Sequence, residues 1–89
     1  MDKIEYNDLF DSLSYGHDAD LKIAGLRFFA EWNGNEIDVY RMSEDSGVKI
    51  ASFRGENKIE TVNELFDFCF IPGKSLNNSY QEIMILDIE

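Results

Sequence analysis

The sequence predicts a single α+β domain over residues 1–89, an antiparallel β-meander with its helices on one face. Three observations predict this class. Residues 2–14 carry apolar side chains at helical spacing, residues 20–53 alternate with a period of two between turn signals, and residues 61–88 hold a second capped helix and an isoleucine-rich strand. The expected element order is αββββαβ, with the helices segregated to one side of the sheet.

The first predicted helix covers residues 2–14. Asp2 and Glu5 have the spacing of a capping box, in which each side chain accepts a hydrogen bond from the other residue's backbone N–H. Gly16 stands where a helix end favours a residue that tolerates positive φ. The apolar stripe of this helix is Tyr6, Leu9, Phe10 and Leu13. Glu5, Asp8 and Asp11 form a row of carboxylates on the other side.

Three turn signals set the register of a four-stranded meander. Asn33–Gly34 is the strongest, because a type I′ hairpin turn requires positive φ at both central positions. Ala24–Gly25 predicts a second tight turn, and Ser43–Ser46 predicts a loop. The predicted cross-strand pairs are Ile23 with Leu26, Leu21 with Phe28, Ala30 with Ile37, Phe28 with Val39, and Val39 with Ile50.

These registers agree on one apolar face, which supports the meander. Its members are Leu21, Ile23, Leu26, Phe28, Ala30, Ile37, Val39, Val48 and Ile50.

The opposite face of the predicted sheet combines carboxylates with aromatic rings. Glu31 is expected directly across from Glu36, with Asp38 on the same face, and like charges placed opposite each other destabilise a sheet by about 0.2–1 kcal/mol. Phe29, Tyr40 and Phe53 are expected beside them. Aromatic anchors among charges are typical of protein interfaces. Two interpretations remain open, a binding surface and a face covered by the chain's own C-terminal segment.

The C-terminal third predicts a helix, a turn and a last strand. Thr61 and Glu64 have the spacing of a second capping box, which opens a helix to about Phe70. Its expected buried stripe includes Cys69 as a structural thiol. Pro72–Gly73 predicts a turn, and one further helical turn is expected in residues 75–80. The strand over residues 82–88 is expected to be covered on both sides, or to have its outer face covered by a partner.

The residues do not assemble a recognisable reaction centre. Gly73, Lys74 and Ser75 resemble the end of a phosphate-binding loop, but Phe68 occupies the place of the required earlier glycine. His17 has neither a second histidine nor a cysteine at metal-ligand spacing. We therefore expect a protein that is not an enzyme and has no metal and no cofactor.

The net charge of −10 on 89 residues is unevenly distributed along the sequence. Residues 1–20 and 56–89 each carry a net charge of −5, and the middle is neutral. Such a chain repels nucleic acid and attracts a basic groove on another protein. A single cysteine and the absence of an apolar leader or of an apolar run near 18 residues favour a cytoplasmic location.

Two motifs of the C-terminal half carry a family resemblance. They are Thr61-Val62-Asn63-Glu64-Leu65-Phe66 and Ile71-Pro72-Gly73-Lys74-Ser75-Leu76, which precede the isoleucine-rich strand. This pattern resembles small acidic proteins of low-GC Gram-positive bacteria and their mobile elements, over residues 20–88. Such proteins are similar in character to anti-CRISPR proteins, which block the nucleic-acid groove of a Cas effector.

The resemblance implies a DNA-mimicking inhibitor of a Cas9-like nuclease, whose carboxylates replace phosphates. Two alternatives stay open: an immunity protein or antitoxin that neutralises a basic toxin, and a structural protein without an acidic interface. No direct contact with nucleic acid or membrane is expected. The candidate partner-binding residues are Asp8, Asp11, Phe29, Glu31, Glu36, Asp38, Tyr40, Glu44 and Asp45.

Overall fold

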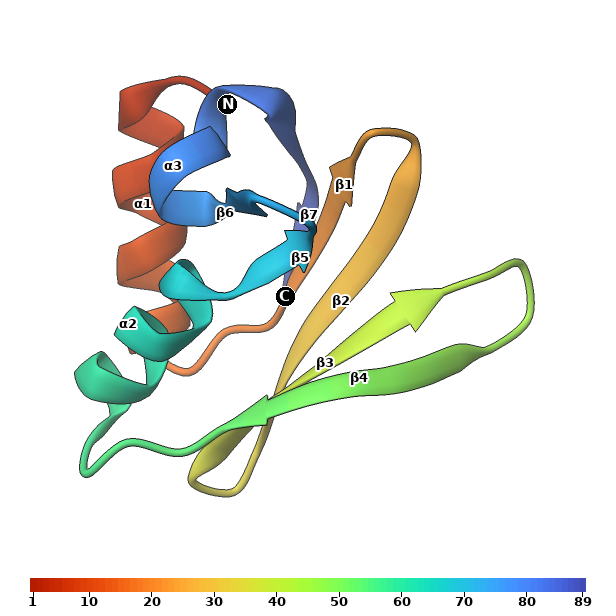
Figure 1. Ribbon diagram of the computed structural model, residues 1–89. Coiled ribbons are helices and arrows are strands. Elements are labelled where there is room, and N and C mark those ends of the chain that lie inside the picture. Colours follow the sequence, from red (N-terminus) through yellow and green to blue (C-terminus); the bar gives the residue numbers. More distant parts are fainter.

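A computed structural model describes all residues, 1–89, and its main feature is a five-stranded antiparallel sheet with helices on one side (Figure 1). The strand order is β4-β3-β2-β1-β7. The strands are β1 (Ala19–Ile23), β2 (Leu26–Asn33), β3 (Glu36–Met42), β4 (Gly47–Phe53) and β7 (Ile83–Ile88). The α+β class and the meander of the first four strands are confirmed.

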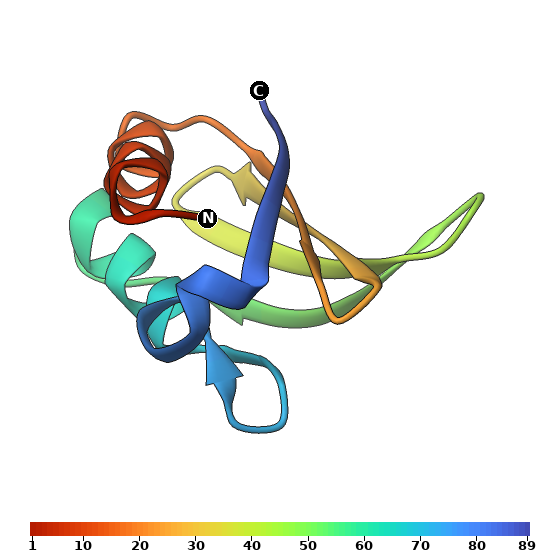
Figure 2. The same ribbon diagram turned by 90° about the horizontal axis from the view of Figure 1, so that it is seen from above.

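The helical side of the molecule contains three helices and a small ribbon. The helices are α1 (Lys3–Ser14), α2 (Lys58–Asp67) and α3 (Leu76–Ser79), the last followed by a 3-10 turn, η1 (Tyr80–Glu82). The ribbon pairs β5 (Cys69–Ile71) with β6 (Lys74–Ser75). Seen from above, these elements and the sheet form two layers, and the β3–β4 hairpin extends well beyond the helices (Figure 2). The ribbon was not predicted.

Helix α1 forms as its sequence predicts. Asp2 accepts a hydrogen bond from the backbone N–H of Glu5 at 2.8 Å, and Glu5 accepts one from the N–H of Asp2 at 3.1 Å. Leu9 and Leu13 are buried, and Gly16 ends the helix at φ 102°. Phe10 and Tyr6 pack their rings on Phe66 of α2, with centroids 5.1 and 5.3 Å apart.

The β1–β2 register is confirmed, but the β2–β3 register differs by two residues. Ala24 and Gly25 both have positive φ, 51° and 77°, as a type I′ turn requires. In the next hairpin only Gly34 has positive φ, so the turn residues are Gly34 and Asn35. Glycine in the first central position is the arrangement that type II′ turns favour.

The changed turn moves each predicted β2–β3 partner along β3. Ala30 pairs with Val39, Phe28 with Arg41, and Glu31 with Asp38. The predicted pairs of Ala30 with Ile37, Phe28 with Val39, and Glu31 with Glu36 are therefore wrong. Because the shift is an even number, Ile37 and Val39 still face the core, where both are fully buried.

A β-bulge makes the β3–β4 pairing differ from the prediction. Near the loop, Tyr40 pairs with Lys49, but Val39 pairs with Ala51, so Ile50 has no direct partner. The predicted pair of Val39 with Ile50 is wrong for this reason. The bulge also brings Phe53 opposite Ile37 on the core side, where its ring packs on Phe68 with centroids 5.3 Å apart. Phe53 therefore does not belong to the outer face.

Helix α2 begins earlier and ends earlier than predicted. Its N-cap is Asn57, whose side chain accepts a hydrogen bond from the N–H of Glu60 at 2.9 Å. Thr61 lies buried in the first turn, where its hydroxyl donates to the Asn57 carbonyl at 2.8 Å. Since the helix ends at Asp67, Cys69 falls in β5 and is exposed, while Phe70 takes the inward position. The prediction of a buried Cys69 is therefore wrong.

The last strand, β7, pairs with β1 and forms one edge of the sheet. Ile83 faces the core, but Met84 and Leu86 are 59% and 44% exposed. A strand covered on both sides is therefore excluded. The expected helical turn before it is present as α3, with a capping box between Ser75 and Asn78.

The core lies between the sheet and the helices. It contains Leu9 and Leu13 of α1, Val62, Leu65 and Phe66 of α2, Leu76 of α3, Phe70 of β5, and the inward residues of β1, β2, β3 and β7. None of the helices combines the length and apolar character that crossing a bilayer requires.

Candidate functional site

The outer face of the sheet, which no helix covers, holds most of the predicted binding residues. Phe29 and Tyr40 are direct cross-strand partners and are both half-buried. Glu31 and Glu36 are also half-buried. Asp38 differs from them, since only 1% of its surface is exposed. In this conformation Asp38 is enclosed within the protein and does not reach a partner.

The carboxylate of Asp38 is satisfied by its own neighbours. The Ser52 hydroxyl donates to Oδ1 at 2.6 Å, and the Asn33 amide donates to Oδ2 at 3.3 Å. The Lys49 ammonium lies 3.8 Å from Oδ2. These groups, with the Ser52 hydrogen bond the largest contributor, lower the pKa of Asp38, and its burial acts in the opposite direction. Asp38 and these three neighbours therefore form a structural polar cluster within the sheet.

One further acid on the outer face, Asp20, is paired with a basic side chain. The Arg27 guanidinium forms a bidentate pair with Asp20, with Nε 2.8 Å from Oδ1 and Nη2 2.5 Å from Oδ2. Lys22 lies on the same face as Arg27, its cross-strand partner. Phosphate mimicry requires free negative charge, and on this face Glu31 and Glu36 are without a basic partner but are half-buried.

A repulsive pair persists on this face, although its members differ from the prediction. Glu31 is the direct cross-strand partner of Asp38, and Glu36 faces Asn33. The two carboxylates of the first pair oppose each other across β2 and β3, which is unfavourable for the free protein.

The helical side carries most of the excess negative charge. Residues 1–18 and 55–82, which contain all three helices and the small ribbon, hold ten acidic and three basic residues. The rest of the chain, which contains the main sheet, holds eight acidic and five basic residues. Seven of the ten excess negative charges thus belong to the helical side.

We call the exposed acids of α1 and α2, taken together, the acidic helical face. Its members are Glu5, Asp8, Asp11, Glu60, Glu64 and Asp67. None of them forms an ion pair. Side chains three or four residues apart on a helix lie about 5–6 Å apart, so each helix presents a line of negative charge.

The nearby lysines contact aromatic rings. The Lys3 ammonium lies 4.1 Å from the ring centroid of Tyr6, and the Lys58 ammonium lies 5.8 Å from that of Trp32. Lys74, the third base on this side, pairs with Glu82. None of the three bases therefore forms an ion pair with a member of the acidic helical face.

The remaining predicted residues, Glu44 and Asp45, lie at the tip of the β3–β4 hairpin. Both are exposed, and the loop is held by Ser43, whose N–H donates to the Ser46 carbonyl at 2.8 Å. The tip lies at the far end of the molecule from α1 and α2 (Figure 1). The nine predicted residues therefore fall on three separate surfaces, not on one.

Sequence reasoning missed the acids of α2. Glu60, Glu64 and Asp67 are exposed on α2, which packs beside α1 through the rings of Tyr6, Phe10 and Phe66. The signal was the spacing of Asn57 and Glu60, which repeats the capping pattern four residues before Thr61.

Two residues near the rejected metal and phosphate motifs, Asp18 (beside His17) and Ser75, have structural contacts. Asp18 accepts a hydrogen bond from the Trp32 N–H at 2.9 Å, and Ser75 is the N-cap of α3. The structure contains no group of three or more His, Cys, Asp or Glu residues placed to hold a metal ion. Comparisons of the chain with protein-family models, with curated proteins and with solved structures found no match.

Proposed function

We propose that this chain is a non-enzymatic inhibitor that binds another protein and acts as an acidic DNA mimic. The acidic helical face would occupy the nucleic-acid groove of a basic partner, of which a Cas9-like nuclease is the example that the sequence resemblance implies. The observation that carries the proposal is the set of six exposed carboxylates on α1 and α2 without a cationic partner.

The placement of Asp11 also supports a role in binding. It lies in the last turn of α1, which has no basic residue, and negative charge is unfavourable at a helix C-terminus. The carboxylates of Asp8 and Asp11 are exposed and form neither an ion pair nor a hydrogen bond within the protein. Their removal is therefore not expected to weaken the fold, so any lost binding reports on the surface itself.

The test is a double variant, Asp8→Asn with Asp11→Asn, assayed against a Cas9-type effector loaded with guide RNA. We expect the parent chain to compete with target DNA and to inhibit cleavage, and to show no affinity for DNA alone. The variant should associate more slowly, and its association rate should depend less on salt, because the lost carboxylates act mainly through electrostatic steering.

The control is Glu44→Gln with Asp45→Asn, which removes the same charge from the hairpin tip. If it slows association as much as the helix variant does, the acidic helical face is not the contact. If the parent neither binds the effector nor competes with DNA, a Cas9-like target is excluded. Binding without competition would instead point to the immunity-protein alternative.

A further inference from the structure

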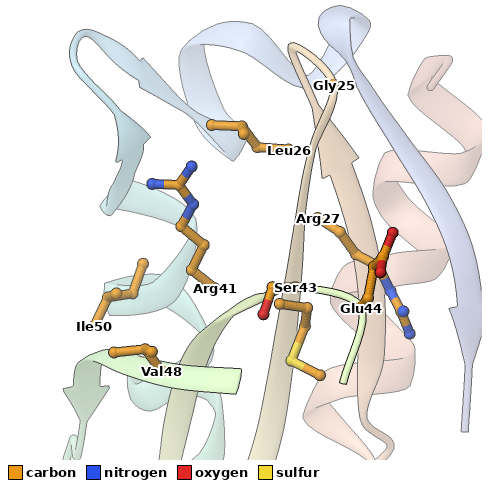
Figure 3. Close-up of a pocket in the computed structure, with 9 residues that line it drawn as sticks. Gly25, Leu26, Arg27, Arg41, Ser43, Glu44, Val48 and Ile50 are labelled. Carbon is orange, nitrogen blue, oxygen red and sulfur yellow. The ribbon is translucent and has the colours of Figure 1, made fainter. Parts of the chain in front are cut away.

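A groove lies between the tips of the β1–β2 and β3–β4 hairpins, where the two hairpins diverge. Its volume is about 720 Å³. It is lined by Gly25, Leu26, Arg27, Arg41, Met42, Ser43, Glu44, Val48 and Ile50. Four of these, Leu26, Arg41, Val48 and Ile50, point to the same side of the sheet, and Arg27 and Glu44 point to the other side (Figure 3).

We call one of these two groups the bare core face. It consists of Leu26, Arg41, Val48 and Ile50, and it continues the surface of the sheet that the helices cover elsewhere. Arg41 is the cross-strand partner of both Phe28 and Val48, so the three side chains share one row across the sheet. Phe28 is 1% exposed and packs on Phe70 of β5, with ring centroids 5.3 Å apart. Arg41 and Val48, the next two residues of the row, have no such cover, and Val48 is 67% exposed.

Two apolar residues of the bare core face, Val48 and Ile50, do not pack against the hydrophobic core. Val48 and Ile50 are 67% and 41% exposed, and Leu26 packs partly against the core. Leu26 therefore joins the bare core face to the packed interior. Exposed apolar residues gathered in a groove mark interaction sites more often than single exposed ones do.

Arg41 is the charged residue of the bare core face. Its exposed guanidinium forms neither an ion pair nor a side-chain hydrogen bond, whereas Arg27 is held by Asp20 on the opposite side of the sheet. A free guanidinium presents a planar fork that matches a carboxylate. Its complement is an apolar segment that carries negative charge.

We propose that the bare core face binds an extended peptide segment of a partner protein, with apolar side chains on Leu26, Val48 and Ile50 and a carboxylate on Arg41. A second copy of the chain is disfavoured, because two molecules with a net charge of −10 repel each other. The open groove, built from adjacent strands, suits an extended chain. This contact has the opposite charge sign to the acidic helical face and does not depend on it.

The test uses the full chain, labelled with ¹⁵N, and a synthetic peptide as the probe. The peptide is acetylated and amidated, with seven residues in which valine, aspartate, isoleucine and valine alternate with serine, so that these four side chains share one side of an extended strand. A panel varies the apolar positions among valine, isoleucine, leucine and phenylalanine. We expect amide shift changes at Leu26, Arg41, Val48 and Ile50.

Two comparisons isolate the predicted contacts. Arg41→Gln, and a peptide with asparagine in place of aspartate, should each weaken binding at least fivefold. Arg54→Gln removes an exposed arginine outside the groove and should leave binding unchanged. Ile50→Thr should also weaken binding. The amide spectrum of each variant shows whether it remains folded.

The proposal is overturned if no peptide of the panel shifts these amides at millimolar concentration. It is also overturned if Arg41→Gln and Arg54→Gln behave alike, or if the asparagine peptide binds equally well. If analytical ultracentrifugation shows that the parent is a dimer and that Arg41→Gln is a monomer, the occupant of the groove is a second copy of the chain and the proposal is overturned. The double variant Asp8→Asn with Asp11→Asn should bind the peptide as the parent does, even if it no longer inhibits the effector. This result would show that the groove acts independently of the proposed function.

Discussion

The two ends of strand β3 differ in a way that residue type does not predict. At its beginning, Ile37, Asp38 and Val39 are all buried, although one of them is a carboxylate. Toward its other end, Val48 and Ile50 of the neighbouring strand β4 are exposed although they are apolar. Both segments are paired strands of the same sheet. Burial here is determined by what covers the strands, and the cover is provided by segments distant in the sequence.

The largest expected effect comes from the covered end. Phe28→Ala removes a fully buried ring that packs on Phe70, and it should lower the free energy of unfolding by about 3–5 kcal/mol. For a domain of 89 residues this is a large part of the total stability. Chemical denaturation followed by tryptophan fluorescence measures the change.

Ile50→Thr is the matched control at the bare end. Because Ile50 is 41% exposed and lies at the bulge, its replacement should change the free energy of unfolding by less than about 0.5 kcal/mol. If Phe28→Ala and Ile50→Thr lowered the free energy of unfolding equally, the β3–β4 hairpin would have to be covered within the folded protein. The two ends of β3 would then not differ in burial.

The second effect concerns the buried carboxylate. Asp38→Asn should destabilise the protein by roughly 1–3 kcal/mol at pH 7, since it replaces the charged acceptor of two hydrogen bonds. The pKa of Asp38 is lowered in the folded protein, so its stabilising contribution is present above the ordinary aspartate pKa of about 3.9 and is lost as the pH falls below it.

Urea denaturation of Asp38→Asn and of the parent between pH 7 and pH 2.5 tests this sign. The difference between them should be constant down to about pH 4 and should shrink at lower pH, because the parent's carboxyl then becomes protonated. A constant difference down to pH 2.5 would contradict the structural role of the Asp38 charge. Asp45→Asn, in the exposed loop, should match the parent at pH 7.

The smallest expected effect concerns the repulsive pair. Glu31→Gln should increase the free energy of unfolding by a few tenths of a kcal/mol, because it removes a charge directly across from Asp38. Thermal unfolding at low salt is the sensitive measurement, and Glu44→Gln at the hairpin tip controls for the change in net charge. A destabilised Glu31→Gln would show that Glu31 contributes a favourable contact that outweighs the repulsion.

The sequence prediction was correct for elements that short-range interactions determine and wrong where contacts between distant segments determine the structure. The α1 capping box and the β1–β2 register depend on neighbouring residues, and both are correct. The turn predicted at Asn33–Gly34 is wrong by one residue, because the chain turns at Gly34 and Asn35 and brings Ala30 opposite Val39. The bulge beside Val39 has no local signal, because it satisfies the packing of Phe53 against Phe68 across the layers.

The candidate site shows the same limit. The acidic row of α1 could be predicted from helical spacing, and its residues are exposed as expected. The enclosure of Asp38 could not, because it depends on Asn33, Ser52 and Lys49 from both neighbouring strands. Val48 and Ile50 of the bare core face have the alternating pattern of a buried strand, and the sequence therefore predicted them on the core face. In the structure the helices do not extend far enough to cover them, so both are exposed.

The bulges have a consequence for self-association. Each edge strand of the sheet contains one residue without a direct partner, Ile50 in β4 and Leu86 in β7. An uninterrupted edge is a template on which strands of other molecules add, and irregular edges with charged residues prevent this. Lys49 in β4 and Asp87 in β7 lie next to the two irregular positions. The protein thus exposes apolar side chains at both edges of its sheet, but neither edge offers the regular ladder on which an amyloid-like stack would grow.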